Sequence, residues 1–146
     1  MLTAHPDTVA LWPVHPNPTV RDDVESEIAK LPAVVQKRIC LTVPLDYPAL
    51  IDLLGCCHFT LTDSGGIQEE ASAFAKPVLI TRTSTERQEL VDAGGAILVG
   101  TDPEQIRRYA EQLLGNPEFY RGMQVDHSPF GDGKSSQRIA DILSSH

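Results

Sequence analysis

The chain has 146 residues, of which 41% are hydrophobic and 22% are charged, and its formal net charge is −8. This size predicts one domain over residues 1–146 that buries roughly 70% of its unfolded surface. The acidic balance argues against nucleic acid or an anionic membrane as a partner, because no basic run offsets the repulsion.

Short apolar runs alternate with amphipathic segments, which is the pattern of βα units and a parallel sheet. Residues 1–7 are typical of a last helical turn and its stop signal, so we expect the chain to have been cut or re-started there. The first strand is predicted at residues 9–14, and the helix after it has Pro18 in its first turn. A second strand covers residues 39–42, and Asp46 caps the next helix.

The middle of the chain continues this alternation. Three further strands are predicted, at residues 58–62, 77–81 and 96–99. Helices are predicted between them, at residues 64–74 and 86–93. The sequence therefore predicts a Rossmann-like α/β fold, with one open parallel sheet, helices on both faces and ligands at the carboxyl ends of the strands.

Only helices are predicted after the fifth strand. Asp102 caps the first of them, with Pro103 in its first position, and the pair Asn116–Pro117 starts a short second one. Ser135 or Ser136 opens a closing helix, whose apolar side consists of Ile139, Ile142 and Leu143.

The three cysteines, Cys40, Cys56 and Cys57, make no Cys-x-x-Cys pair and lack the spacing of a zinc site. Two of them are adjacent, so we predict reduced thiols in a cytoplasmic protein rather than a structural disulfide. No signal peptide and no apolar run near 18 residues is found, so a membrane span is not predicted. Neither a metal nor a cofactor is predicted.

The most informative stretch is residues 59–71, where an apolar run ends in a polar turn, two glycines follow and a helix begins. Glycines let backbone N–H groups approach an anion, and the positive end of the new helix points at the charge. Ser64, Gly65 and Gly66 are therefore candidate phosphate ligands. The same residues also fit a tight strand-to-helix turn in which Ser64 is only the N-cap.

Residues 62–70, with the sequence Thr-Asp-Ser-Gly-Gly-Ile-Gln-Glu-Glu, closely resemble the signature of the non-hydrolysing UDP-N-acetylglucosamine 2-epimerases. Other pieces of the family pattern follow in the same order, at residues 13–18, 82, 85–87, 98–101 and 131–133. The resemblance covers almost the whole chain but only the C-terminal half of that enzyme. A Thr-x-His-Arg-x-Glu-Asn motif expected before the Pro-Val-His segment is absent, as is the domain that supplies the catalytic carboxylates. The resemblance thus implies one half of a GT-B-type two-domain fold.

The resemblance implies that the Ser64–Gly66 amides grip the β-phosphate of UDP and that Glu70 accepts hydrogen bonds from the ribose hydroxyls. Arg87 would neutralise the diphosphate, although Gln88 replaces the proline that follows this arginine in the family. Each has a plainer alternative, since Glu70 fits a glutamate stabilised by the helix dipole and Arg87 fits a surface arginine. Glu69 is predicted to be structural, and Arg82 is predicted to be part of the loop's scaffold.

Leu50 is a candidate uracil contact by the same resemblance, whereas Leu45 is predicted to be a core residue. His15 matches a family histidine that helps bind a second, regulatory UDP-N-acetylglucosamine, and it equally fits a scaffolding histidine in a turn. His58 and His127 show no partner in the sequence and are predicted to have no role in the site.

The family reaction interconverts UDP-N-acetylglucosamine and UDP-N-acetylmannosamine by elimination and re-addition of UDP. No catalytic residue is predicted in this half, so the chain is expected to bind UDP or UDP-N-acetylglucosamine and to be inactive alone. The expected partner is the missing N-terminal domain, in cis or in trans, and a homodimer is left open. The alternatives are a donor-nucleotide domain of a GT-B glycosyltransferase, a hydrolysing epimerase, and a non-catalytic split subunit.

Overall fold

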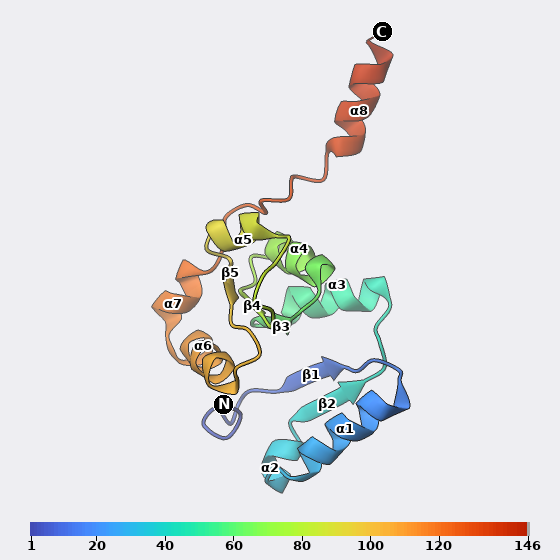
Figure 1. Cartoon of the computed structure of the whole chain (residues 1–146). Coiled ribbons are helices and arrows are strands. Elements are labelled where there is room, and N and C mark those ends of the chain that lie inside the picture. The colour runs from blue at the N-terminus through green and yellow to red at the C-terminus, as the bar shows by residue number, and fades with distance from the viewer. Residues whose placement is uncertain (146) are drawn as a thin grey trace. The chain divides into compact units, whose positions relative to one another are not determined.

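Five short parallel strands, paired in two sheets, organise the part of the chain that the computed structural model describes, residues 1–145 (Figure 1). The chain forms two units, one comprising Met1–Leu50 and the other beginning at Ile51. The predicted fold class is confirmed, because parallel strands alternate with helices along the chain. No helix within residues 1–145 combines the length and the apolar character that a membrane span requires.

The first unit contains a pair of strands and two helices. Strand β1 (Ala10–Pro13) pairs in parallel with β2 (Ile39–Thr42), with Ala10 opposite Ile39. Between them lie α1 (Pro18–Ala29) and α2 (Ala33–Gln36). Helix α1 begins where the sequence predicted, since the Asn17 side chain accepts a hydrogen bond from the Thr19 N–H at 3.0 Å and Pro18 needs no acceptor for its own nitrogen.

Helix α3 (Tyr47–Cys56) follows β2 and leads into the second unit. The predicted cap is confirmed, because the Asp46 carboxylate accepts the N–H of Ala49 at 3.0 Å. The thiols of Cys40, Cys56 and Cys57 are free, and burial raises the pKa of Cys57 above its ordinary value.

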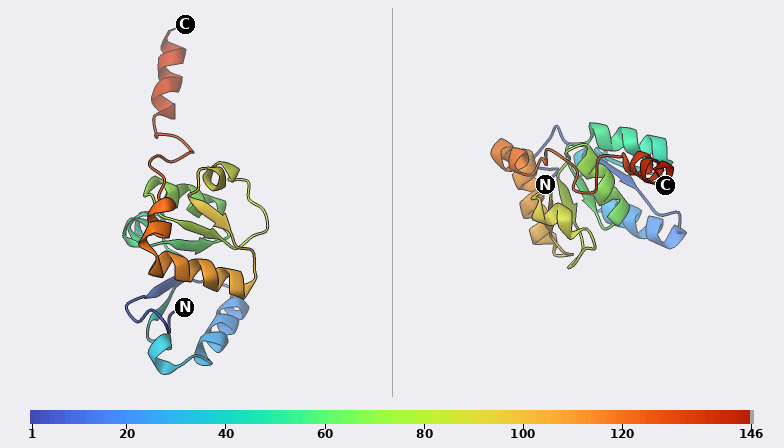
Figure 2. Two further views of the ribbon diagram at one scale, coloured as in Figure 1. Left: turned by 90° about the vertical axis from the view of Figure 1, so that its left-hand side faces the viewer. Right: turned by 90° about the horizontal axis from the view of Figure 1, so that it is seen from above.

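The second unit is built on a three-stranded parallel sheet in the order β3 (Thr60–Thr62), β4 (Val78–Ile80), β5 (Ala96–Leu98). All three residues of the central strand are fully buried. An all-apolar run is typical of such a strand, because helices cover both of its faces. Figures 1 and 2 show helix α4 (Gly65–Ala73) on one face of this sheet and α6 (Pro103–Gly115) on the other.

Three shorter or later helices complete the second unit. They are α5 (Gln88–Asp92), α7 (Pro117–Gly122) and α8 (Ser135–Ser144). The expected apolar side of α8 is present in its sequence, but no residue of α8 is buried within the described chain. Because β3, β4 and β5 are parallel, the loops that follow them leave the sheet at the same edge, and this edge positions the candidate site.

Candidate functional site

Ser64 ends the turn between β3 and α4 and is the N-cap of that helix. Its backbone is extended, with φ −82° and ψ 124°, and its hydroxyl accepts the Ile67 N–H at 3.5 Å. Its own N–H donates to the Thr62 hydroxyl at 3.1 Å. Gly65 and Gly66 are the first two helical residues, so their N–H groups have no acceptor within the helix. The β3–α4 corner therefore presents helix-start amides at the ligand edge of the sheet.

Gly65 and Gly66 do not adopt a backbone conformation that requires glycine. Neither has a positive φ, in contrast to Gly94 and Gly100. What the lack of a side chain allows here is the close approach of another group. A Cβ atom on Gly65 would lie 3.4 Å from Cζ and 3.5 Å from Nη2 of Arg87. Gly65 therefore leaves the space in which the guanidinium of Arg87 rests, and a cation 22 residues away in sequence lies beside the start of α4.

A carboxylate holds this guanidinium in place. Arg87 Nε donates to Glu69 Oε1, and the two side chains are 33% and 40% exposed. Within residues 1–145, no hydrogen bond from the terminal nitrogens Nη1 and Nη2 to another residue is formed. Glu69 was predicted to be structural, and the structure gives it a specific structural contact, the ion pair with Arg87.

A second set of contacts fixes the backbone of Arg87. The Thr85 hydroxyl accepts the Arg87 N–H at 3.1 Å and donates to Gln68 Oε1 at 2.7 Å. Gln68 is fully buried, and within the described chain its Nε2 has no hydrogen-bond acceptor. The two sequence motifs at residues 62–70 and 85–87 are thus joined through side chains. The bond from the Arg87 N–H to Thr85 could have been predicted from the sequence, because a threonine hydroxyl often accepts the N–H two residues later. The bond from Thr85 to Gln68 could not, because it joins residues 17 positions apart.

Glu70 lies in the second turn of α4 and is half-buried. The first turn of that helix contains no acidic residue. Because the helix dipole acts mainly within the first turn, the alternative of a glutamate stabilised only by the dipole is weakened. The ribose role of Glu70 stays a prediction.

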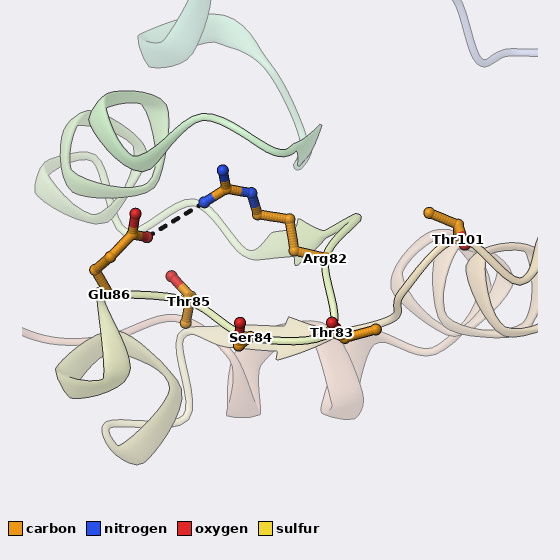
Figure 3. Close-up of a pocket in the computed structure, with 6 residues that line it drawn as sticks. All are labelled: Arg82, Thr83, Ser84, Thr85, Glu86 and Thr101. Carbon is orange, nitrogen blue, oxygen red and sulfur yellow. Dashed lines mark hydrogen bonds and ion pairs between the residues drawn. The ribbon is translucent and has the colours of Figure 1, made fainter.

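A polar depression lies on the same edge of the sheet, where β4 and β5 end (Figure 3). Its lining comprises Arg82, Thr83, Ser84, Thr85, Glu86 and Thr101. The only ion pair drawn within it joins Arg82 Nη1 to Glu86 Oε2 at 3.3 Å. A backbone hydrogen bond and, next, the charge of Arg82 hold the pKa of Glu86 below its ordinary value. Thr85 thus connects this depression to the Arg87 contacts.

The remaining predicted ligands, Leu50 and His15, belong to the first unit. Leu50 is half-buried near the start of α3, and the neighbouring Leu45 is half-buried in the preceding loop. His15 is exposed after β1, and its Nδ1 accepts the Asn17 N–H at 3.2 Å. This bond fits the scaffolding alternative for His15, while its regulatory role and the uracil contact of Leu50 stay predictions.

His58 has partners that the sequence did not suggest. Its ring stacks on Tyr120 with centroids 4.1 Å apart, and its Nε2 lies 3.1 Å from the carbonyl oxygen of Leu113. The prediction that His58 has no partner is therefore wrong, because residues 55 and 62 positions away approach it only in the fold. No three His, Cys, Asp or Glu side chains among residues 1–145 are grouped as metal ligands.

The fold and the corner together define a class: α/β proteins of the GT-B type, whose ligands sit where parallel strands end. Residues 1–144 match the family model described as UDP-N-acetylglucosamine 2-epimerase. The chain therefore belongs to the UDP-N-acetylglucosamine 2-epimerase family, which is a family of isomerases.

Individual relatives agree with this assignment. The UDP-N-acetylglucosamine 2-epimerase of Bacillus subtilis is 41% identical over 140 residues, which cover 96% of this chain and 36% of the relative. A structure of S. aureus MnaA with UDP has a TM-score of 0.87 at 35% identity, over 99% of this chain and 37% of that one. A Neisseria meningitidis UDP-GlcNAc 2-epimerase bound to UDP-GlcNAc has a TM-score of 0.85 at 34% identity, over 99% and 38%. The chain thus spans little more than a third of the length of the relatives it matches.

Proposed function

We propose that this chain is the C-terminal, UDP-binding domain of a UDP-N-acetylglucosamine 2-epimerase that interconverts UDP-GlcNAc and UDP-ManNAc in the cytoplasm. One observation carries the proposal: the guanidinium of Arg87 rests against Gly65, beside the Gly65 and Gly66 amides, which have no acceptor within α4. Such a pairing of fixed dipoles with a cation suits a pyrophosphate. The family and the UDP-bound relatives support the identity of the nucleotide.

Different residues are proposed to bind the phosphate and the ribose of the nucleotide. The amides and hydroxyl of Ser64, Gly65 and Gly66 bind the β-phosphate, and Arg87 offsets its charge. Glu70 accepts hydrogen bonds from the ribose hydroxyls. The net charge of −8 does not oppose this, because amides and one guanidinium act locally while distant carboxylates are screened over about 10 Å.

Two further contacts are proposed for the first unit. Leu50 supplies an apolar surface for the uracil. His15 contributes to a second, regulatory UDP-GlcNAc site.

The chemistry requires groups that this chain is proposed to lack. UDP is eliminated and re-added at the sugar, so its leaving charge must be held throughout, and the corner can meet this demand. An acid and a base must also move the proton at C2. We assign those groups to an N-terminal domain, present in cis or in trans, because the chain spans about 37% of its relatives. Alone, the chain binds UDP and does not epimerise; the complete enzyme could assemble as a homodimer.

Calorimetric titration of the full chain tests the nucleotide site. We expect UDP and UDP-GlcNAc to bind more tightly than ADP, since solved relatives hold UDP and UDP-GlcNAc. Arg87→Gln should weaken UDP binding about 10-fold or more, because hydrogen bonds to charged groups contribute about 1.5–3 kcal/mol. Arg121→Gln, at an exposed arginine of α7, is the matched control and should leave binding unchanged.

Equal affinities for ADP and UDP, or an unchanged affinity in Arg87→Gln, would overturn the site. Conversion of UDP-GlcNAc by the purified chain alone would contradict the proposed incompleteness. Release of free N-acetylmannosamine after an N-terminal domain is added would instead favour hydrolysing chemistry.

A further inference from the structure

We infer that Glu69 is a positioning residue that aims the free edge of the Arg87 guanidinium at the phosphates; the inference rests on the proposed UDP site. The guanidinium carries five N–H donors in a fixed plane. Glu69 takes the Nε edge, while Nη1 and Nη2 form no hydrogen bond within residues 1–145. Nη2 is the nitrogen nearest to the space above Gly65. Glu69 thus holds the guanidinium at Nε, the Cζ and Nη2 atoms lie over Gly65 at the start of α4, and Nη1 and Nη2 keep their donors for a ligand.

A second anchor acts on the backbone of the same residue. Thr85 accepts the Arg87 N–H and donates to Gln68, which is fully buried in α4. Gln68 and Glu69 are neighbours on one helix, so both ends of Arg87, its main chain and its guanidinium, are tied to α4. The phosphate amides belong to the start of that helix. The position of Arg87 relative to these amides is therefore fixed by two contacts to the helix that carries them.

The sign of the effect separates positioning from charge compensation. If Glu69 only neutralised Arg87, removing its charge would strengthen the attraction for a diphosphate. If Glu69 instead holds the guanidinium in place, removing the Glu69 carboxylate frees the Arg87 side chain. Arg87 must then lose rotamer freedom when UDP binds, and this entropy cost weakens binding. Because the pair is partly exposed, the Coulomb contribution is screened, and we expect the loss of orientation to dominate.

Calorimetry with UDP and UMP on the full chain provides the test. Glu69→Gln should weaken UDP binding about 3- to 10-fold. It should change UMP binding less than about 2-fold, since UMP lacks the phosphate next to the Gly65 amide. In an Arg87→Gln background the same change should have no further effect, because its only route is through the guanidinium. Glu104→Gln, which removes an exposed carboxylate from another Arg–Glu pair, is the matched control and should leave both affinities unchanged.

Thr85 offers a second, independent variant. Thr85→Val removes the hydroxyl that joins Gln68 to the Arg87 N–H and should weaken UDP more than UMP, whereas Thr85→Ser should retain the wild-type affinity. Circular dichroism tests whether each variant is folded. If either Glu69→Gln or Thr85→Val fails to fold, UDP binding by the other variant still tests the positioning role.

The outcomes are separable. If wild type binds UDP and Arg87→Gln weakens it, but Glu69→Gln binds UDP as tightly as wild type or more tightly, the positioning role is refuted and the proposed function stands. Additive effects in the double variant refute the role as well. If wild type shows no preference for UDP, the proposed function itself fails.

Discussion

Helices α6 and α8 have similarly pronounced apolar stripes, but within residues 1–145 only the stripe of α6 contains buried residues. In α6, Ala110 and Leu113 are buried, the leucine to 1% exposure. In α8, Ile139, Ile142 and Leu143 are 57%, 61% and 73% exposed. An amphipathic pattern therefore predicts a helix and its apolar side, but not whether that side has a partner within the chain.

The two helices also begin differently. Helix α6 leaves β5 through a short connection, and the Asp102 side chain accepts the Glu104 N–H at 3.1 Å. Helix α8 follows a loop in which Gly131 and Gly133 have positive φ, and its N-cap, Lys134, makes no side-chain capping bond. Helix α6 therefore begins at a side-chain cap close behind a strand of the sheet, whereas α8 begins after a loop and without such a cap.

The largest expected effect comes from the same substitution in both helices. Leu113→Ala should lower the free energy of unfolding by about 2–5 kcal/mol, because it leaves a cavity under α6. Leu143→Ala should stay within about 0.5 kcal/mol, since the side chain is largely exposed. Urea denaturation followed by circular dichroism measures both. Equal losses would mean that the stripe of α8 is covered in solution and would remove the contrast.

Capping provides a smaller difference. Asp102→Ala should cost about 1 kcal/mol, because the first turn of α6 loses the acceptor of an N–H group. Lys134→Ala, at the corresponding position of α8, should change stability by less than about 0.5 kcal/mol. Thermal unfolding of the two variants beside wild type tests this. A cost at Lys134 as large as that at Asp102 would contradict the difference in caps.

The smallest effects concern exposed ion pairs near the start of each helix. The hydrogen bonds from Arg138 and then from the Lys134 N–H hold the pKa of Asp132 below its ordinary value, and Arg107 does the same for Glu104. A carboxyl whose pKa is lower in the folded state stabilises the fold above its unfolded pKa, and this contribution is lost as the pH falls through the folded pKa. We therefore expect both pairs to weaken only in acid. NMR titration of the carboxyl groups should show the Asp132 pKa rising in Arg138→Gln while that of Glu104 stays unchanged.

If the Asp132 pKa did not move in Arg138→Gln, the ion pair would not exist in solution. The converse variant, Arg107→Gln, should raise the pKa of Glu104 alone. Each variant is thus the control for the other.

Much of the fold could be predicted from the sequence. The strand at residues 39–42 matches β2, and the predicted starts of α1, α6 and α7 are confirmed by their Asn or Asp caps and the prolines that follow. These signals are local, because a cap bonds to N–H groups two or three residues away. The pairing of strands in two sheets is not a local property, and the sequence suggested a single open sheet.

The candidate site could be predicted only as separate pieces. The turn at Ser64, with two glycines after it, is visible in the sequence and is confirmed as the start of α4. The contact of Arg87 with Glu69, and that of Thr85 with Gln68, were not predicted, because 17 or 18 residues separate the partners.

The sequence by itself determined where α1, α6 and α7 begin, which segments are apolar, and which family motifs the chain carries, since each depends on neighbouring residues and on the order of side chains. Only the tertiary structure decided that α6 is covered and α8 is not, and that Arg87 rests against Gly65. The physical reason is that burial and side-chain pairing depend on how β3, β4 and β5 bring their loops to one edge, and that arrangement is a property of the whole sheet rather than of any segment.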